Sequence, residues 1–155
     1  MTTSKIKSLA HLKSLLATQK KKVVLANGCF DILHVGHVRY LEEAKDLGEI
    51  LVVAINSDKS ARQLKGKGRP VTNEKERAEI ISALECVNYV TIFDEPDVAN
   101  IILSLKPSIQ AKGTDYTADS VPEAETVRSY GGKVVITGDP KNHSSSDIIK
   151  NIGRP

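Results

Sequence analysis

The chain has 155 residues, 40% of them apolar, which is enough for one globular domain with a continuous hydrophobic core. Its net charge is +3, but Met1–Lys22 holds six lysines and no acidic residue, so the remainder carries about −3. This balance disfavours a nucleic-acid-binding body, which needs basic residues spread over its contact face, and we expect no nucleic-acid partner.

The two cysteines and the absence of long apolar runs favour a reducing compartment. Cys29 and Cys86 each lie in apolar surroundings, as buried thiols do, and are too few for a disulfide framework. No apolar run approaches the roughly 18 residues of a membrane span, and the lysine-rich start lacks the apolar core of a secretory signal. We therefore expect a cytoplasmic protein with no membrane association.

The first 20 residues predict an amphipathic helix. Apolar side chains recur at helical spacing at Ile6, Leu9, Leu12, Leu15 and Leu16. The acid-poor, serine-containing composition is also found in transit peptides, but a helix docked on the core is the interpretation that we favour. The prediction is one domain over residues 1–155, with the helix at 1–20 docked on it.

Five short apolar segments alternate with helical patterns in the rest of the chain. The expected strands are Val23–Ala26, Ile50–Ile55, Tyr89–Phe93, Ile109–Lys112 and Val134–Thr137. Strands separated by helices require crossover connections, so the predicted fold class is α/β, a single doubly wound parallel sheet with helices on both faces. Ligands then bind at the carboxyl ends of the strands, near the topological switch point.

Capping residues, or a proline suited to a first turn, mark three further helix starts. They lie at Asn73 with Glu76, at Pro96, and at Ser120 with Glu123. The last of these helices is expected to end at Gly131 and Gly132.

The segment after the first expected strand carries the strongest chemical signal. His34 and His37 lie one turn apart at a helix start, where backbone N–H groups and the helix dipole favour phosphate. Gly36 lets a phosphate approach the backbone, and imidazole N–H groups donate to oxygens whose charge grows during phosphoryl transfer. Two alternatives stay open: a pair that only caps the helix, and a metal pair, for which no third strong ligand lies nearby.

A run of three serines near the C-terminus is a second candidate phosphate site. Ser144, Ser145 and Ser146 precede an apolar helical run, so their hydroxyl and backbone N–H groups converge at a helix N-terminus. Capping alone explains one serine, and three in a row favour a bound nucleotide.

These motifs resemble the signature of the cytidylyltransferase-like nucleotidyltransferase superfamily. The signature is carried by Gly28, Phe30, Asp31, His34, Gly36 and His37. The similarity continues through Val53–Asp58, Leu64–Gly66, Arg69–Val71, Lys112–Tyr116 and Ser144–Lys150. Together they resemble the heptose 1-phosphate adenylyltransferase branch, from about Lys22 to the C-terminus. The resemblance implies a Rossmann-like nucleotidyltransferase fold of the HIGH type, and transfer of AMP from ATP to a sugar 1-phosphate, giving ADP-heptose and pyrophosphate.

The resemblance also implies residue roles. The implied catalytic residues are His34, His37, Lys65 and Lys67. The implied nucleotide-binding residues are Asn27, Gly28, Cys29, Phe30, Gly36, Lys112, Gly113, Asp115, Ser144, Ser145 and Ser146. The implied substrate-binding residues are Asp31, Asp58, Arg69 and Arg77. Mg²⁺ is the expected cofactor, held mainly by the nucleotide phosphates and water, with no protein metal ligand.

Several of these roles have structural alternatives. The lysines of the 65–69 loop suit phosphate because flexible ammonium groups follow moving charge, but the loop would also be stable as a solvated basic segment. Arg77 would be unremarkable on a helix surface, and Asp115 would be ordinary in a turn. Asp31 could instead orient the histidine loop through backbone bonds.

The acceptor and the class of protein also have alternatives. Related glycerol phosphate enzymes carry an arginine where this chain has Asp139–His143, which argues against glycerol phosphate and leaves the roles of Lys141 and His143 open. The rival enzyme is a cytidylyltransferase using CTP and a small alcohol phosphate such as glycerol 3-phosphate. A nucleotide-binding regulatory module and a nucleic-acid interaction protein are the other classes. Family members are often dimers, so a homodimer is expected, and ADP-heptose would feed the heptose units of bacterial lipopolysaccharide.

Overall fold

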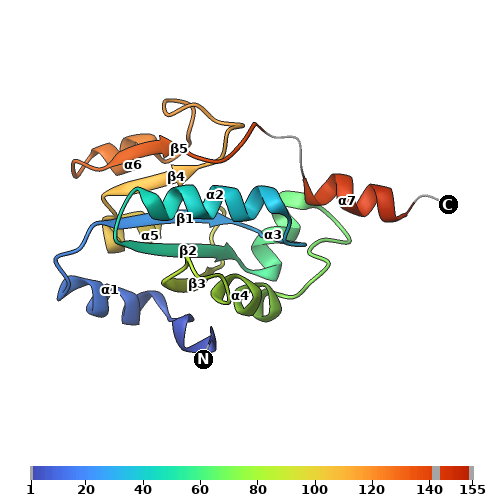
Figure 1. The fold of residues 1–155 in the computed structure, drawn as a ribbon, viewed down its shortest axis with the longest axis horizontal. Helices are drawn as coiled ribbons and strands as arrows, with labels where there is room; N and C mark the ends of the chain where they lie inside the picture. Colours follow the sequence, from blue (N-terminus) through green and yellow to red (C-terminus); the bar gives the residue numbers. More distant parts are fainter. Residues whose placement is uncertain (1, 141–143, 154–155) are drawn as a thin grey trace.

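The computed structural model describes residues 2–140 and 144–153 (Figure 1). Within them, five strands form one sheet: β1 (Val23–Gly28), β2 (Ile50–Asn56), β3 (Tyr89–Phe93), β4 (Ile109–Lys112) and β5 (Lys133–Ile136). The strand order is β3-β2-β1-β4-β5 and every neighbouring pair is parallel. The predicted α/β fold with a doubly wound parallel sheet is confirmed.

Helices cover both faces of this sheet. One face carries α2 (Val35–Asp46) and α4 (Glu74–Ser82), and the other carries α1 (Leu9–Ala17), α5 (Ala99–Leu105) and α6 (Ala124–Arg128). Along β1, Val24 and Ala26 pack into the first core, whereas Val23 and Leu25 pack into the second. Successive strand side chains point to opposite faces, so a strand buried on both faces is apolar throughout.

Two further helices lie beyond the carboxyl ends of the strands, where the predicted ligand site belongs. They are α3 (Asp58–Lys65) and α7 (Ser145–Ile152), which stands out from the body of the molecule (Figure 1). No helix in the described ranges is long and apolar enough to cross a bilayer.

The N-terminal segment forms a short 3-10 turn, η1 (Thr2–Lys5), followed by α1. Ser8 caps α1 by accepting a hydrogen bond from the His11 N–H, and Leu12 and Leu16 are buried in the second core. Ile6 was predicted to belong to this helix but lies before it, paired with Val90 beside β3. The cap at Ser8 starts the helix after Ile6, which explains the difference.

The predicted helix starts had mixed outcomes. Asn73 caps α4 as expected, since its side chain accepts from the Glu76 N–H at 3.0 Å. The Ser120 cap is wrong, because α6 begins only at Ala124 and Ser120 bonds to Thr117 in a separate turn. Val121 precedes a proline, which disfavours a helical conformation there.

The ends of two elements also differ from expectation. The α6 helix ends at Arg128, before the glycines that were expected to end it. Pro96 lies ahead of α5 rather than in its first turn, because the Asp97 carboxylate accepts from the Ala99 N–H at 2.9 Å and starts a local turn.

Candidate active site

A cavity of about 440 Å³ opens at the carboxyl ends of the central strands. The chain winds outward from β1 to β2 and β3, then crosses back to β4 on the other side of β1. The connections leaving β1 and β3 cover opposite faces of the sheet, which leaves a crevice beside β1. The cavity lies at this topological switch point, as the sequence predicts.

Most of the predicted site residues line this one cavity, although they come from four separate segments. Those that line it are Asn27, Gly28, Cys29, Phe30, Asp31, His34, Gly36, His37, Lys65, Arg69, Lys112, Gly113, Asp115, Ser144, Ser145 and Ser146. Lys67, Asp58 and Arg77 do not line it.

The two histidines form a reciprocal cap at the start of α2. His34 Nδ1 accepts from the Gly36 N–H at 3.1 Å, and His37 Nδ1 accepts from the His34 N–H at 3.3 Å. A ring nitrogen that accepts carries no proton, so each neutral imidazole carries its proton on Nε2. The rings stack with their centroids 3.8 Å apart. Capping and phosphate binding are therefore compatible, because they use different nitrogens of the same rings.

Two aromatic residues, Phe30 and Tyr40, pack next to the histidine pair. The Phe30 ring is buried and meets His37 edge-on, with 5.2 Å between ring centroids. Phe30 also stacks with Tyr40, whose hydroxyl donates to the Ala111 carbonyl at 2.6 Å. Burial raises the pKa of Tyr40 well above its ordinary value, so this phenol stays neutral.

The Asp31 carboxylate faces the protein rather than a ligand. Oδ2 accepts from Arg69 Nε at 3.0 Å and from the Val71 N–H at 2.8 Å, while Oδ1 accepts from the N–H and the hydroxyl of Thr72, both at 3.1 Å. Burial alone would raise the pKa of Asp31, but the bonds from Val71, Thr72 and Arg69 together hold it below its ordinary value. These bonds tie the histidine loop to the 69–72 segment, and they give no support to the predicted substrate-binding role of Asp31.

The basic residues at the end of α3 and in the loop that follows it differ in whether they reach the cavity. Lys65 and Arg69 line the cavity, and Arg69 also donates to Ser146 Oγ at 3.3 Å. Lys67 lies outside the cavity wall with its side chain exposed, between two glycines of positive φ, Gly66 and Gly68. The predicted catalytic contact of Lys67 therefore has no support in this arrangement, because the loop turns at both glycines.

The three serines have three different partners. Ser144 caps α7 by accepting from the Asp147 N–H at 3.0 Å. The Ser145 hydroxyl donates to the carbonyl oxygens of Asp31 and Ile32, and Ser146 accepts from Arg69. The side chains of Ser145 and Ser146 thus fasten α7 to the histidine loop and to Arg69, and the first residues of α7 line the cavity. A helix N-terminus at such a place favours anions.

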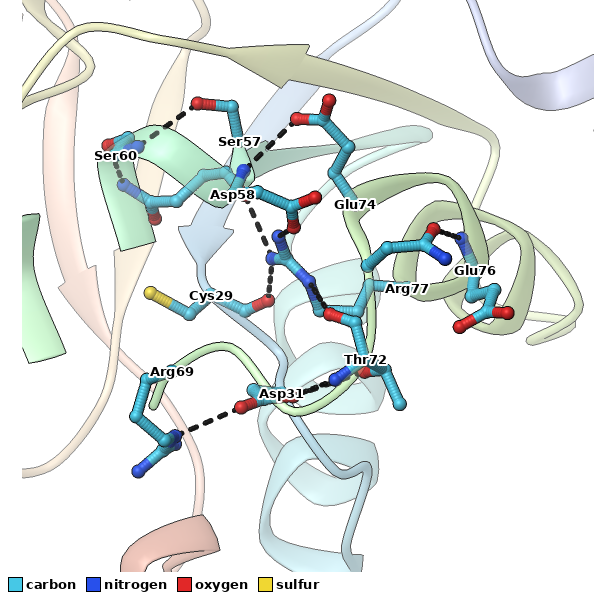
Figure 2. Close-up of polar contacts among 12 residues, drawn as sticks. Cys29, Asp31, Ser57, Asp58, Ser60, Arg69, Thr72, Glu74, Glu76 and Arg77 are labelled. Atoms are coloured by element: carbon cyan, nitrogen blue, oxygen red, sulfur yellow. Dashed lines mark hydrogen bonds and ion pairs between the residues drawn. The ribbon is translucent and has the colours of Figure 1, made fainter. Parts of the chain in front are cut away.

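A buried Arg77 and a partly exposed Asp58 form an ion pair outside the cavity lining (Figure 2). The Arg77 side chain is fully buried, and its guanidinium donates to the carbonyl oxygens of Cys29, Asn56 and Thr72 and to the Asp58 carboxylate. This arrangement gives no support to the predicted substrate contact of Arg77, and the predicted role of Asp58 stays a prediction. A buried cation needs such partners, and the strand ends supply them.

The far wall of the cavity, beyond β4 and β5, was partly missed by sequence reasoning. Lys112 lines it with its ammonium 4.7 Å from the centroid of the Tyr116 ring. Residues 137–140 line it after the end of β5, where Gly138, at φ +93°, packs against the Tyr40 backbone. Their position after a strand end is the signal that identifies them. Lys141 and His143 lie outside the described residues.

Two comparisons with known protein sequences bear on this site. The family model described as cytidylyltransferase-like matches residues 25–151. Bifunctional protein HldE of Geobacter sulfurreducens is 46% identical over 152 residues, and that of Geobacter metallireducens is 47% identical over 154 residues. The alignments cover 96% and 97% of this chain and 31% of each relative, so the chain spans about a third of their length.

Solved structures give the same fold. The crystal structure of a lipopolysaccharide core biosynthesis protein from Thermoplasma volcanium matches with a TM-score of 0.66 and 33% identity, over 78% of this chain and 99% of that one. Pantothenate synthetase from Thermus thermophilus matches with a TM-score of 0.60 and 16% identity, over 90% of this chain and 63% of that one, a likeness of fold alone. With the match of residues 25–151, these findings place the chain in the cytidylyltransferase-like family.

Proposed function

We propose that this chain is a nucleotidyltransferase that transfers AMP from ATP to heptose 1-phosphate and releases pyrophosphate. The observation that carries the proposal is the convergence of phosphate-binding groups on one cavity. The imidazoles of His34 and His37, the ammonium groups of Lys65 and Lys112, and the N-terminus of α7 all line it. These are the groups that a reaction between two anions requires.

The reaction that suits this site is a direct displacement at the α-phosphorus. A phosphate oxygen of the acceptor forms the new bond to phosphorus, and the bond to the bridging oxygen of pyrophosphate breaks with its electron pair leaving on pyrophosphate. The acceptor is already an anion, so no side chain has to remove a proton and no covalent enzyme intermediate is needed. The Nε2–H groups of His34 and His37 stabilise the charge that grows on the phosphate oxygens.

The choice of ATP and heptose 1-phosphate rests on similarity to other proteins. The motifs of the histidine loop, the 112–116 segment and the 144–150 segment resemble the heptose 1-phosphate adenylyltransferase branch. The identity of 46% to a bifunctional protein HldE, and the likeness to a protein of lipopolysaccharide core biosynthesis, support the same choice. In this proposal ADP-heptose serves lipopolysaccharide synthesis, and the chain works in the cytoplasm as a homodimer.

Mg²⁺ belongs to the proposal as a cofactor that arrives with the nucleotide. Among the residues that the structure describes, no three His, Cys, Asp or Glu side chains gather as a metal site. Two of the carboxylates at the cavity already have partners, since Asp31 accepts four hydrogen bonds and Asp139 pairs with Arg39. This wall fits an ion whose ligands are mainly phosphate and water oxygens. When bound, Mg²⁺ supplies charge neutralisation between the phosphates.

The decisive experiment is pyrophosphate release with Mg²⁺. ATP, CTP and GTP are each paired with heptose 1-phosphate and with glycerol 3-phosphate, and His37→Ala serves as the control. Release confined to ATP and heptose 1-phosphate, and lost in His37→Ala, supports the proposal. Release with CTP and glycerol 3-phosphate would replace the substrates with those of a cytidylyltransferase. Nucleotide binding without release in any pairing would favour a regulatory module.

A further inference from the structure

The turn that delivers the histidines to the cavity has an unfavourable backbone. Phe30 and Ile32 have φ angles of +49° and +58°, in the left-handed region that L-residues rarely adopt. Ile32 is β-branched, for which this conformation is a marked outlier. The turn stands between β1 and His34, so it sets where the histidine pair lies. Such a conformation persists only when surrounding groups hold it.

Arg77 holds the start of the turn. The last residue pair between β1 and β2 is Gly28 with Ile55, and the next residue along the chain is Cys29 after β1 and Asn56 in β2. Arg77 Nη1 donates to both of their carbonyl oxygens, at 2.6 Å and 2.8 Å. The guanidinium therefore joins the ends of β1 and β2 at the point where the pairing between these two strands stops.

The middle of the turn is held from two other segments. The Asp31 side chain is 2% exposed and accepts four hydrogen bonds from Arg69, Val71 and Thr72. Two carboxylate oxygens offer about four acceptor positions, so little capacity remains for a sugar hydroxyl. On the backbone side, the Ser145 hydroxyl donates to the carbonyl oxygens of Asp31 and Ile32.

We propose that Asp31, Arg77 and Ser145 are positioning residues that hold the 29–32 turn in its left-handed conformation and thereby place the Nε2–H donors of His34 and His37. The three residues come from the turn itself, from α4 and from α7. Through Ser145 the same contacts also fix the N-terminus of α7 beside the histidine loop. The catalytic consequence rests on the proposed function, whereas the effect on the imidazoles does not.

The main test is Asp31→Asn, which keeps the size of the side chain but turns an NH₂ group toward donors. Misplaced histidines should lower kcat about 100-fold. The KM values for ATP and heptose 1-phosphate should stay within about twofold, because substrate binding is not the step affected. The matched control is Asp119→Asn, which removes an exposed carboxylate paired with Arg128 outside the cavity and should leave kcat unchanged.

Ser145→Ala is the second variant, and it tests the turn without removing a buried charge. Loss of the hydroxyl bonds should lower kcat about tenfold. Ser129→Ala, which removes a hydroxyl at the end of α6 that bonds to Thr126, is its control. If Asp31→Asn does not fold, Ser145→Ala still tests the positioning role.

An activity-independent measurement separates this proposal from the proposed function. The imidazole ¹⁵N resonances of His34 and His37 should report a proton on Nε2 in the wild type and a mixture of tautomers in Asp31→Asn. This readout applies even if the wild type turns over none of the substrates, an outcome that would refute the proposed function alone. A raised KM for heptose 1-phosphate at unchanged kcat would show that Asp31 binds substrate. That result, or folded variants with unchanged kcat and unchanged resonances, would overturn the positioning role.

Discussion

Replacing His34 with asparagine should separate the structural role of this residue from its chemical role. His34 Nδ1 caps α2 by accepting from the Gly36 N–H at 3.1 Å, and its Nε2–H is the donor that we assign to phosphate. Asparagine is among the best N-cap residues and places an oxygen near the position of Nδ1, but it has no atom that reaches the position of Nε2. Alanine lacks both groups.

The expected magnitudes follow from these two contacts. His34→Ala should lose about 1 kcal/mol of capping free energy, which corresponds to a fall in Tm of roughly 2–4 °C for a domain of this size. His34→Asn should keep the wild-type Tm, because the cap is retained. Both variants should lose about 100- to 1,000-fold in kcat, the usual effect of removing one donor to a developing oxyanion.

The assays are thermal unfolding followed by circular dichroism and pyrophosphate release at saturating ATP and heptose 1-phosphate. His11→Ala is the control. His11 is exposed on α1, which covers the opposite face of the sheet from α2 and its His34 cap. Near-normal kcat in His34→Asn would refute the reasoning and leave His34 as a capping residue only. An unchanged Tm in His34→Ala would show that the cap contributes no stability.

Three other outcomes are expected. The pKa of Asp31 is lower in the folded protein than its ordinary value of 3.8, so its contribution to stability is present above that value and is lost as the pH falls through the folded pKa. Urea unfolding should therefore show the stability difference between wild type and Asp31→Asn shrinking as the pH falls below about 4. A constant difference would contradict a stabilising role of the ionised Asp31 carboxylate. Leu12→Ala removes a fully buried side chain where α1 meets the second core, and it should cost about 2–5 kcal/mol in urea unfolding while nucleotide binding by the folded protein is retained. Chelation by EDTA should stop turnover but leave the Tm of the nucleotide-free protein unchanged, whereas a large fall in Tm would indicate a resident metal ion.

Patterns within a few residues were sufficient for much of this protein. Continuously apolar segments predicted the strands of a parallel sheet, since both faces of those strands are buried. The caps at Asn73 and His34 depend on contacts two or three residues apart, so they too could be predicted from the sequence. The Ser120 cap is wrong because the Ser120 hydroxyl bonds to Thr117 instead and because Pro122 disfavours a helical conformation at Val121.

Only the tertiary structure decided which polar residues face the cavity. Arg77 bonds to the carbonyl of Cys29, 48 residues away, and Ser145 bonds to that of Asp31, 114 residues away. A charged residue on a helix looks the same in the sequence whether it meets substrate or buried carbonyl oxygens. The difference arises when the crossover connections bring β1, β2 and α7 together, because burial then requires every polar group to find a partner. The sequence determined which chemical groups are available to the site, and chain packing determined which of them bond to other protein groups and which line the cavity.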